Sequence, residues 1–168
     1  PIFASQNIPF DGETTDTTPN MVTNYPLSVK EQTIPISVVS MGNPHCIIFQ
    51  NDLPQALEPS QWGPTIEAHP IFPNKTNVEF VTVVDDSTLD VVVWERGCGF
   101  TLACGTGACA VGVLAHVLNK TNNTVTVNLP GGPLNIFWDK EKSGHVFMTG
   151  PATTVFSGKI DIPLSEVD

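Results

Sequence analysis

Cys104 stands in a glycine-rich segment whose residue types suit acid–base chemistry at a carbon atom. The segment 94–107 reads WERGCGFTLACGTG, and a long apolar run follows it. A helix that begins here would present unpaired backbone N–H groups, which bind anions. Cys104 would lie at the N-terminus of that helix, where partial positive charge favours the thiolate, the basic and nucleophilic form of cysteine. The segment therefore predicts a thiol base beside an anion-binding site.

The neighbouring residues indicate that the anion is a carboxylate. Gly105 and Gly107 allow a ligand to approach the backbone closely. Arg96 is the only arginine in the chain, and its planar fork suits a carboxylate better than a lysine would. A thiol base beside a carboxylate site is what the removal of a proton α to a carboxylate requires. An effective base also needs a pKa near the working pH.

Two cofactor-based interpretations fit these residues less well. Gly105-x-Gly107-x-x-Ala110 is similar to a dinucleotide fingerprint, but that motif needs an acidic residue about 20 positions later, and the next acid here is Asp139. A zinc site is a second alternative, and its ligands would be Cys98, Cys104, Cys109 and His45. The absence of a CxxC pair in the chain argues against that site. No lysine lies near the glycine-rich segment, which argues against a pyridoxal enzyme. We therefore expect no cofactor and no metal.

Structural roles remain open for several of the same residues. Glu95 and Arg96 could form a plain ion pair, and His45 could be a core or loop-capping residue. Cys46 and Cys109 are expected to be small buried hydrophobes. We expect the cysteines to be reduced, because the chain has the features of a cytoplasmic protein.

The apolar run after Gly107 predicts the element that positions Cys104. Between Gly97 and Trp138 there is no acidic residue, and Lys120 is the only base. Residues 108–118 are apolar on every face except for His116, so a helix here must be buried all round. The predicted architecture is α+β, with a mostly antiparallel curved sheet wrapped around one central buried helix. The predicted strands are Thr33–Val39, Cys46–Gln50, Val78–Val84, Leu89–Trp94, Thr124–Leu129, Leu134–Trp138, Val146–Thr149 and Thr153–Ile160, with a short helix at Ser60–Ala68.

Composition excludes some partners. The 168 residues include 17 acidic and 7 basic side chains, a net charge of −10. Nucleic acid and anionic membranes are therefore poor partners. No run of about 18 apolar residues or signal-peptide pattern occurs, so we expect a cytoplasmic protein. Because the first residue is Pro1 and not Met, we also expect the chain to be a piece or a processed product of a longer one.

The segment from Glu95 to Ala108, ERGCGFTLACGTGA, resembles the second-cysteine motif of the diaminopimelate epimerases. Three further stretches agree with that family: Ser40–His45, Thr76–Phe80, and Leu129–Gly132 followed by Met148–Ala152. The resemblance extends from Pro1 to about Ile160. It implies the epimerase-like α+β roll and a cofactor-independent inversion of one α-carbon, which interconverts LL- and meso-diaminopimelate for lysine and peptidoglycan synthesis.

The resemblance also implies roles for individual residues. Cys104 would be one of two cysteines that face opposite sides of the reacting carbon. Gly105 and Thr106 would hold its carboxylate through backbone N–H groups. His45 would tune the thiol pKa. Glu95 would tune it too, and would contact substrate together with Asn43, Asn77 and Arg96.

The partner cysteine of the family lies in a first domain that carries a Cys-Gly-Asn-type motif, and these 168 residues contain no such motif. The resemblance therefore implies that residues 1–150 are the C-terminal domain, with an irregular initial segment at 1–30. Residues 151–168 would be a terminal strand and tail that pack on the absent N-terminal domain. Phe156 occupies the position of a dimer-interface tyrosine, so a homodimer is expected at full length. The fragment alone is expected to be inactive.

Two other functions remain as alternatives. The proline racemases have a related two-cysteine fold, although the Glu95-Arg96-Gly lead-in favours the epimerase. A non-catalytic module that holds an acidic ligand would also use a carboxylate site and a lone arginine.

Overall fold

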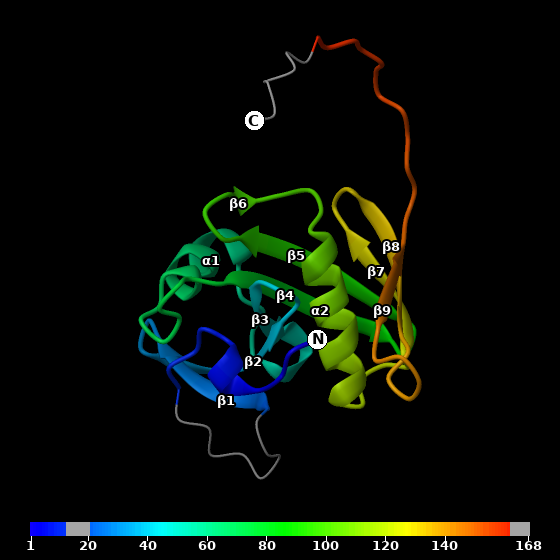
Figure 1. Ribbon diagram of the computed structural model, residues 1–168. Coiled ribbons are helices and arrows are strands. Elements are labelled where there is room, and N and C mark those ends of the chain that lie inside the picture. The colour runs from blue at the N-terminus through cyan, green and yellow to red at the C-terminus, as the bar shows by residue number, and fades with distance from the viewer. Residues whose placement is uncertain (13–20, 162–168) are drawn as a thin grey trace, which may run out of the picture.

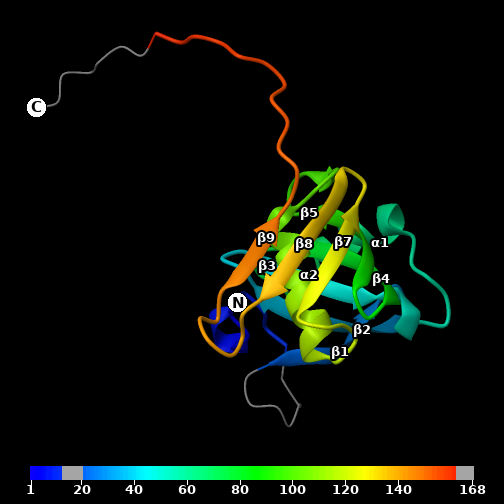
Figure 2. The same cartoon turned by 90° about the vertical axis from the view of Figure 1, so that its right-hand side faces the viewer.

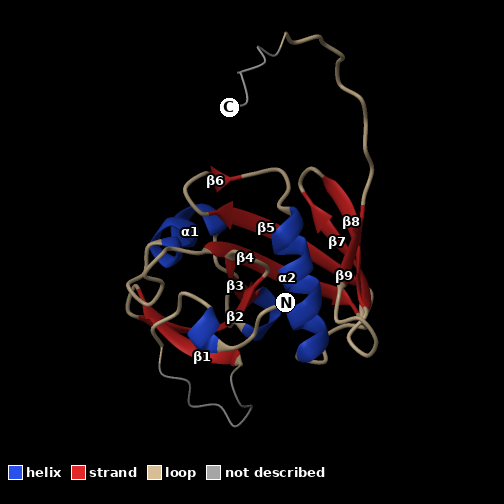
Figure 3. Cartoon of the chain, in the orientation of Figure 1, coloured by secondary structure: helices blue, strands red, loops and turns tan. Residues whose placement is uncertain are grey.

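The computed structural model describes residues 1–12 and 21–161, and a curved, mixed sheet is its largest element (Figure 1). Its strands are β1 (Val22–Val29), β2 (Gln32–Ser40), β3 (Pro44–Phe49), β4 (Asn77–Asp85), β5 (Thr88–Glu95), β6 (Gly99–Phe100), β7 (Thr124–Leu129), β8 (Gly132–Trp138) and β9 (Val146–Thr149). The helices are α1 (Pro59–Glu67) and α2 (Gly105–Val117), with short 3-10 turns at Ser5–Asn7 and Gln50–Asp52. The predicted α+β class is confirmed, with helix α2 in the concave side of the sheet (Figure 3).

The order of strands across the sheet is β1-β2-β3-β4-β5-β7-β8-β9, and β6 pairs with β5 at the side of this path. Neighbouring strands are antiparallel except for two parallel pairs, β3 with β4 and β5 with β7. Parallel neighbours need a crossover connection, usually a helix. Helix α1 makes the first crossover and α2 the second. The site-bearing helix is thus fixed at both ends by strands of one sheet.

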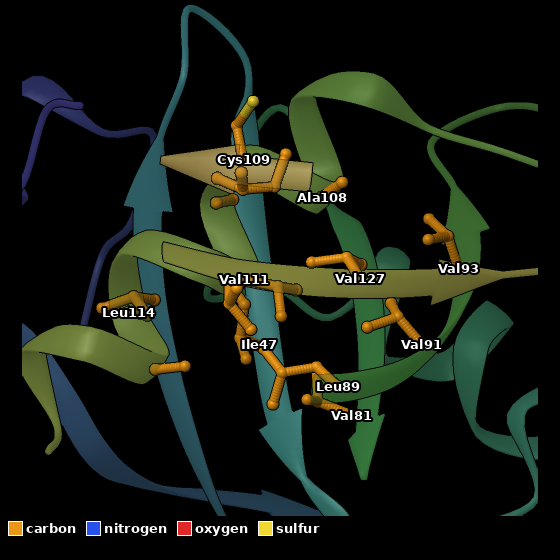
Figure 4. Close-up of a cluster of buried hydrophobic side chains, with 14 of the residues drawn as sticks. Ile47, Val81, Leu89, Val91, Val93, Ala108, Cys109, Val111, Leu114 and Val127 are labelled. Carbon is orange, nitrogen blue, oxygen red and sulfur yellow. The ribbon is translucent and has the colours of Figure 1, made fainter. Parts of the chain in front are cut away.

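Two apolar clusters cover the two faces of the central strands. Alternate residues of β3 face opposite sides, since Ile47 and Phe49 pack toward α2 while Cys46 and Ile48 pack toward α1. All six residues of β3 are buried, as expected for a strand covered on both faces. Figure 4 shows the cluster around α2, where Val111 and Leu114 meet side chains of β3, β4, β5 and β7.

Helix α2 is buried as its uncharged sequence predicts. The nine residues from Gly107 to Ala115 are all buried. At Gly112 an added Cβ would lie 3.0 Å from Ile136 Cγ2, so glycine there allows close contact between the helix and β8. The helix ends where Asn119 adopts φ +55°, and Lys120 N–H donates to the carbonyl of Ala115 over 2.8 Å.

Two predictions about the ends of the chain are wrong within the described residues. The initial segment 1–30 is not irregular throughout, because β1 occupies Val22–Val29 at the edge of the sheet. Proline is tolerated in an edge strand, and Pro26 here pairs with Pro35 of β2. The predicted strand Thr153–Ile160 is absent. Residues 150–161 form no regular structure, are exposed and extend away from the body of the molecule (Figure 2).

No helix in the described ranges is long and apolar enough to cross a membrane.

Candidate active site

Cys104 is the N-cap residue of helix α2. Its backbone is extended, with φ −132° and ψ 106°, and its Sγ accepts a hydrogen bond from the backbone N–H of Gly107 over 3.4 Å. The Thr106 hydroxyl oxygen lies 3.6 Å from the same sulfur. The first backbone N–H groups of a helix have no intrahelical acceptor, so the N–H groups of Gly105 and Thr106 are available to a ligand. The structure thus brings the thiol and the predicted anion-binding amides together.

A cavity of about 460 Å³ opens beside this thiol. Glu95 and the start of α2 supply its polar part, and Met41 of the β2–β3 turn and Met148 of β9 supply apolar surface. Met148 of β9 packs on the backbone of α2, since a Cβ added to Gly105 would lie 3.2 Å from the Met148 sulfur. The lining residues are Met41, Glu95, Ala103, Cys104, Gly105, Thr106, Cys109 and Met148.

The helix N-terminus acts on Cys104 in the expected direction, toward the thiolate, but the net effect of its surroundings is to raise the pKa of this thiol. Burial raises the pKa of the Cys104 thiol, and the charges of Glu79 and Glu95 raise it further. The hydrogen bonds from Thr106 and the Gly107 amide lower the pKa but do not outweigh burial. Cys104 is a buried residue, so loss of hydration outweighs the hydrogen bonds that favour the thiolate.

Two buried side chains position the turn that carries Arg96. Asn77 donates to the carbonyl of Pro44 over 2.9 Å and accepts from the Arg96 N–H over 3.0 Å. Glu67 of α1 accepts from the Gly97 N–H and from the Trp94 indole N–H, at 2.9 and 2.8 Å. Although partial burial opposes ionisation, these bonds and Lys75 lower the pKa of Glu67. Both side chains therefore act on the turn through its backbone.

Glu95 and Arg96 do not form the ion pair that a purely structural interpretation would require. The Glu95 carboxylate lines the cavity and accepts a hydrogen bond from the Thr101 hydroxyl over 2.5 Å. The Arg96 side chain is exposed and donates to the carbonyl of Asn74 over 3.2 Å. Arg96 therefore lies outside the residues that line the cavity, and its predicted contact with substrate stays a prediction.

A buried, hydrogen-bonded pair of side chains, His45 and Glu79, lies beneath the site. His45 and Glu79 are both fully buried, and His45 Nδ1 is 2.6 Å from Glu79 Oε1. His45 Nε2 lies 3.1 Å from Asn43 Oδ1, and the Asn43 amide donates to the Thr106 hydroxyl over 3.4 Å. Asn43 and His45 are thus connected to the first turn of α2, and their roles toward substrate and thiol stay predictions. Burial raises the pKa of Glu79, and repulsion from Glu95 adds to this effect.

Sequence reasoning did not assign Glu79 to the site. The signal available was an acidic residue between the apolar Val78 and Phe80 of β4. The glycine at position 107 is explained by the same residue, because a Cβ there would lie 2.9 Å from Glu79 Oε1.

The zinc alternative finds no support in the described part of the chain. No group of three or more His, Cys, Asp or Glu side chains there could hold a metal ion. Cys98 is exposed, whereas Cys46, Cys104 and Cys109 are buried, and all four thiols are free. Burial raises the pKa of both Cys46 and Cys109, which agrees with their predicted role as small apolar side chains.

The comparison with solved structures places the chain in a class by its fold. The structure is similar to a probable proline racemase from Agrobacterium radiobacter K84 with bound carbonate, with a TM-score of 0.53, 13% identity, and coverage of 75% of this chain and 44% of that one. It is also similar to a methylitaconate-delta-isomerase, with a TM-score of 0.50, 18% identity, and coverage of 76% and 47%. At these identities the similarity shows the fold alone.

The sequence then gives the family. Residues 37–155 match the family model described as diaminopimelate epimerase, and the chain belongs to that family. The diaminopimelate epimerase of Prochlorococcus marinus strain NATL1A is 52% identical over 141 residues, which cover 84% of this chain and 49% of the relative. That of Halothermothrix orenii is 49% identical over 163 residues, covering 96% and 55%. The chain therefore spans about half the length of the curated relatives that it matches.

Proposed function

We propose that this chain carries one of the two acid–base thiols of a diaminopimelate epimerase, and that Cys104 is this thiol. In the proposed reaction one thiolate removes the α-proton of LL-diaminopimelate, and a thiol on the opposite face returns a proton to give the meso isomer. No cofactor takes part. The observation that carries the proposal is Cys104 as N-cap of α2, in a cavity that it shares with Gly105, Thr106 and Glu95.

The first turn of α2 is suited to the carboxylate next to the reacting carbon. The N–H groups of Gly105 and Thr106 have no intrahelical acceptor, and the positive end of the helix favours a bound anion. The same interactions strengthen as negative charge develops on this carboxylate during proton removal. The raised pKa of Cys104 is compatible with a donor role, because a neutral thiol is the proton donor of such a pair.

The second thiol is proposed to come from the part of the family's length that this chain does not span. The chain covers about half of its relatives, and inversion requires acid and base on opposite faces of one carbon. We propose that this other half is the N-terminal domain, that the full-length protein forms a homodimer through a surface that includes Phe156, and that it works in the cytoplasm. The exposed edge of β9 and the apolar residues that follow it are where the N-terminal domain would pack.

The test is α-deuteration in D2O. Protein of full family length should convert LL-diaminopimelate to the meso isomer with deuterium at the inverted carbon, without added cofactor. The 168-residue chain alone should show neither inversion nor sustained exchange. Sustained deuteration with inversion by the chain alone would overturn the need for a second half.

Two other functions are separated by the same assay. Inversion of proline in place of diaminopimelate would identify a proline racemase-like enzyme. Binding of diaminopimelate without exchange by the full-length protein would identify a non-catalytic module.

A further inference from the structure

The Glu79 carboxyl is buried at the base of the site with one oxygen lacking a partner. Its side chain is fully buried, Oε1 lies 2.6 Å from His45 Nδ1, and Oε2 has no hydrogen-bond partner among the described residues. The carboxyl packs against the first turn of α2, because a Cβ on Gly107 would lie 2.9 Å from Glu79 Oε1 and 3.2 Å from Cys104 Sγ. A buried, half-satisfied carboxyl is costly to keep, so its position calls for a functional explanation.

A continuous series of polar contacts leads from this carboxyl to the Cys104 sulfur. His45 Nε2 lies 3.1 Å from Asn43 Oδ1. The Asn43 amide nitrogen donates to Thr106 Oγ1 over 3.4 Å, and that oxygen lies 3.6 Å from Cys104 Sγ. We call this series the Glu79–Cys104 chain. It contains Glu79, His45, Asn43, Thr106 and Cys104.

The donors of the Glu79–Cys104 chain have two self-consistent arrangements. In the first, His45 Nε2–H donates to Asn43, Asn43 donates to Thr106, and the Thr106 hydroxyl donates to a Cys104 thiolate, which can only accept. His45 Nδ1 must then carry a proton or accept one from a protonated Glu79, because two bare acceptors 2.6 Å apart would repel. In the structure Asn43 has the orientation of this arrangement, with Oδ1 toward His45 and the amide nitrogen toward Thr106. This orientation does not depend on the charge of the sulfur, because Thr106 Oγ1 can also accept from a neutral Cys104 S–H.

In the second arrangement every donor is reversed. His45 Nδ1–H donates to an ionised Glu79, the Asn43 amide is turned over, and a neutral Cys104 S–H donates to Thr106. The Glu79–His45 pair holds one proton fewer here than in the first arrangement, and Cys104 holds one more. The total charge of the buried groups is the same in both, so the change does not bury an additional charge.

We propose that Glu79 is a positioning residue for the Cys104 thiol, since the proton that its buried carboxyl shares with His45 keeps the hydrogen bonds of the chain directed toward the sulfur. The inference deepens the proposed function, on which its catalytic meaning depends. The titratable groups that interact electrostatically with Glu79 are His45 on β3, Glu95 on β5, Cys104 at the start of α2, and Cys46 on the other face of β3.

The test is a double-mutant cycle between Glu79→Gln and Thr106→Val in the 168-residue chain. The pH midpoint of iodoacetamide alkylation is measured for the peptide that contains Cys104. With Thr106 present, Glu79→Gln should raise the midpoint by about half a unit, a roughly threefold loss of thiolate. In the Thr106→Val background the hydroxyl that contacts the Cys104 sulfur is already absent. Glu79→Gln then removes only the repulsion between the Glu79 charge and the thiolate, so it should leave the midpoint unchanged or lower it. Equal shifts in both backgrounds would overturn the proposal.

Glu95→Gln is the matched control. Glu95 also raises the pKa of Cys104 through its charge, but it bonds to Thr101 and lies outside the Glu79–Cys104 chain. Its substitution should lower the midpoint equally in both backgrounds. Thr106→Ser, which keeps the hydroxyl, should behave as the wild type.

Asn43→Ala is the second variant if Glu79→Gln prevents folding, as judged by circular dichroism. It breaks the same chain at a half-buried residue and should raise the midpoint only when Thr106 is present; equal shifts in both backgrounds would again overturn the proposal. None of these measurements uses substrate, so their outcome is independent of whether diaminopimelate is inverted.

Discussion

At Cys104, burial and the helix N-terminus act on the thiol in opposite directions. The Gly107 amide and Thr106 hydroxyl favour the thiolate, while burial and two nearby carboxylates favour the neutral thiol. Burial is the largest of these effects, so the chain alone holds Cys104 in its protonated form near neutral pH. A bound substrate carboxylate would add negative charge and favour the neutral thiol further.

The first prediction concerns the titration of Cys104. A raised pKa means that alkylation of this thiol should develop with its midpoint above about 8.5, the usual value for cysteine. Thr106→Val should move the midpoint higher, because it removes a hydrogen bond that lowers the pKa. Mass spectrometry of the alkylated peptide as a function of pH gives both values. A midpoint below the usual value would show that the helix N-terminus outweighs burial.

Residue types and their spacing predicted the thiol, the glycine-rich turn and the buried helix, because these are contiguous in the sequence. The partners that lie under the site come from other strands. In the register of β3 with β4, His45 lies opposite Asn77. Glu79 is two residues further along β4 and therefore lies on the same face of the sheet, beneath the first turn of α2. Strand register is not readable from single residues, so Glu79 was missed, and with it one of the charges that raise the pKa of Cys104.

At the level of elements, the start of α2 leaves little room for a side chain at Gly107. Alanine would place its Cβ 2.9 Å from Glu79 Oε1 and 3.2–3.3 Å from atoms of Cys104. We expect Gly107→Ala to lower the free energy of unfolding by about 1–3 kcal/mol, despite the better helix propensity of alanine. Urea denaturation measures the change. Gly158→Ala is the control, because nothing lies within 4 Å of its added Cβ, and an equal loss there would contradict the steric explanation.

Strand and helix positions followed closely from the sequence where an apolar pattern was bounded by turns. Thr124–Leu129 and Val146–Thr149 agree with β7 and β9 to the residue. Strand β1 was missed because Pro26 and the bulge near Asn24, at φ +52°, interrupt its pattern. Residues 153–160 have strand-forming composition but no neighbouring strand within the described residues to satisfy their backbone groups, so no strand forms.

At the level of the whole molecule, one edge of the sheet is formed by a strand that is paired on one side only, and exposed apolar side chains follow it. Among the described residues strand β9 pairs only with β8, and Val155, Phe156 and Ile160 are 88%, 85% and 84% exposed. Such an edge promotes self-association. We expect the chain to form dimers or larger species as its concentration rises in sedimentation velocity. Replacing these three side chains with serine should shift the profile toward monomer, whereas a wild-type profile that stays monomeric at every concentration would contradict this prediction.

The central claim is that Cys104 performs acid–base chemistry at the α-carbon of diaminopimelate, and inversion in D2O by the full-length protein tests it most directly. Cys104→Ala should reduce inversion by roughly 10²–10⁴-fold, the usual contribution of one acid–base group. Cys98→Ala is the matched control, because that thiol is exposed and does not line the cavity, and it should invert the substrate at the wild-type rate. If the Cys104→Ala variant inverts diaminopimelate as fast as the Cys98→Ala control does, the claim is contradicted.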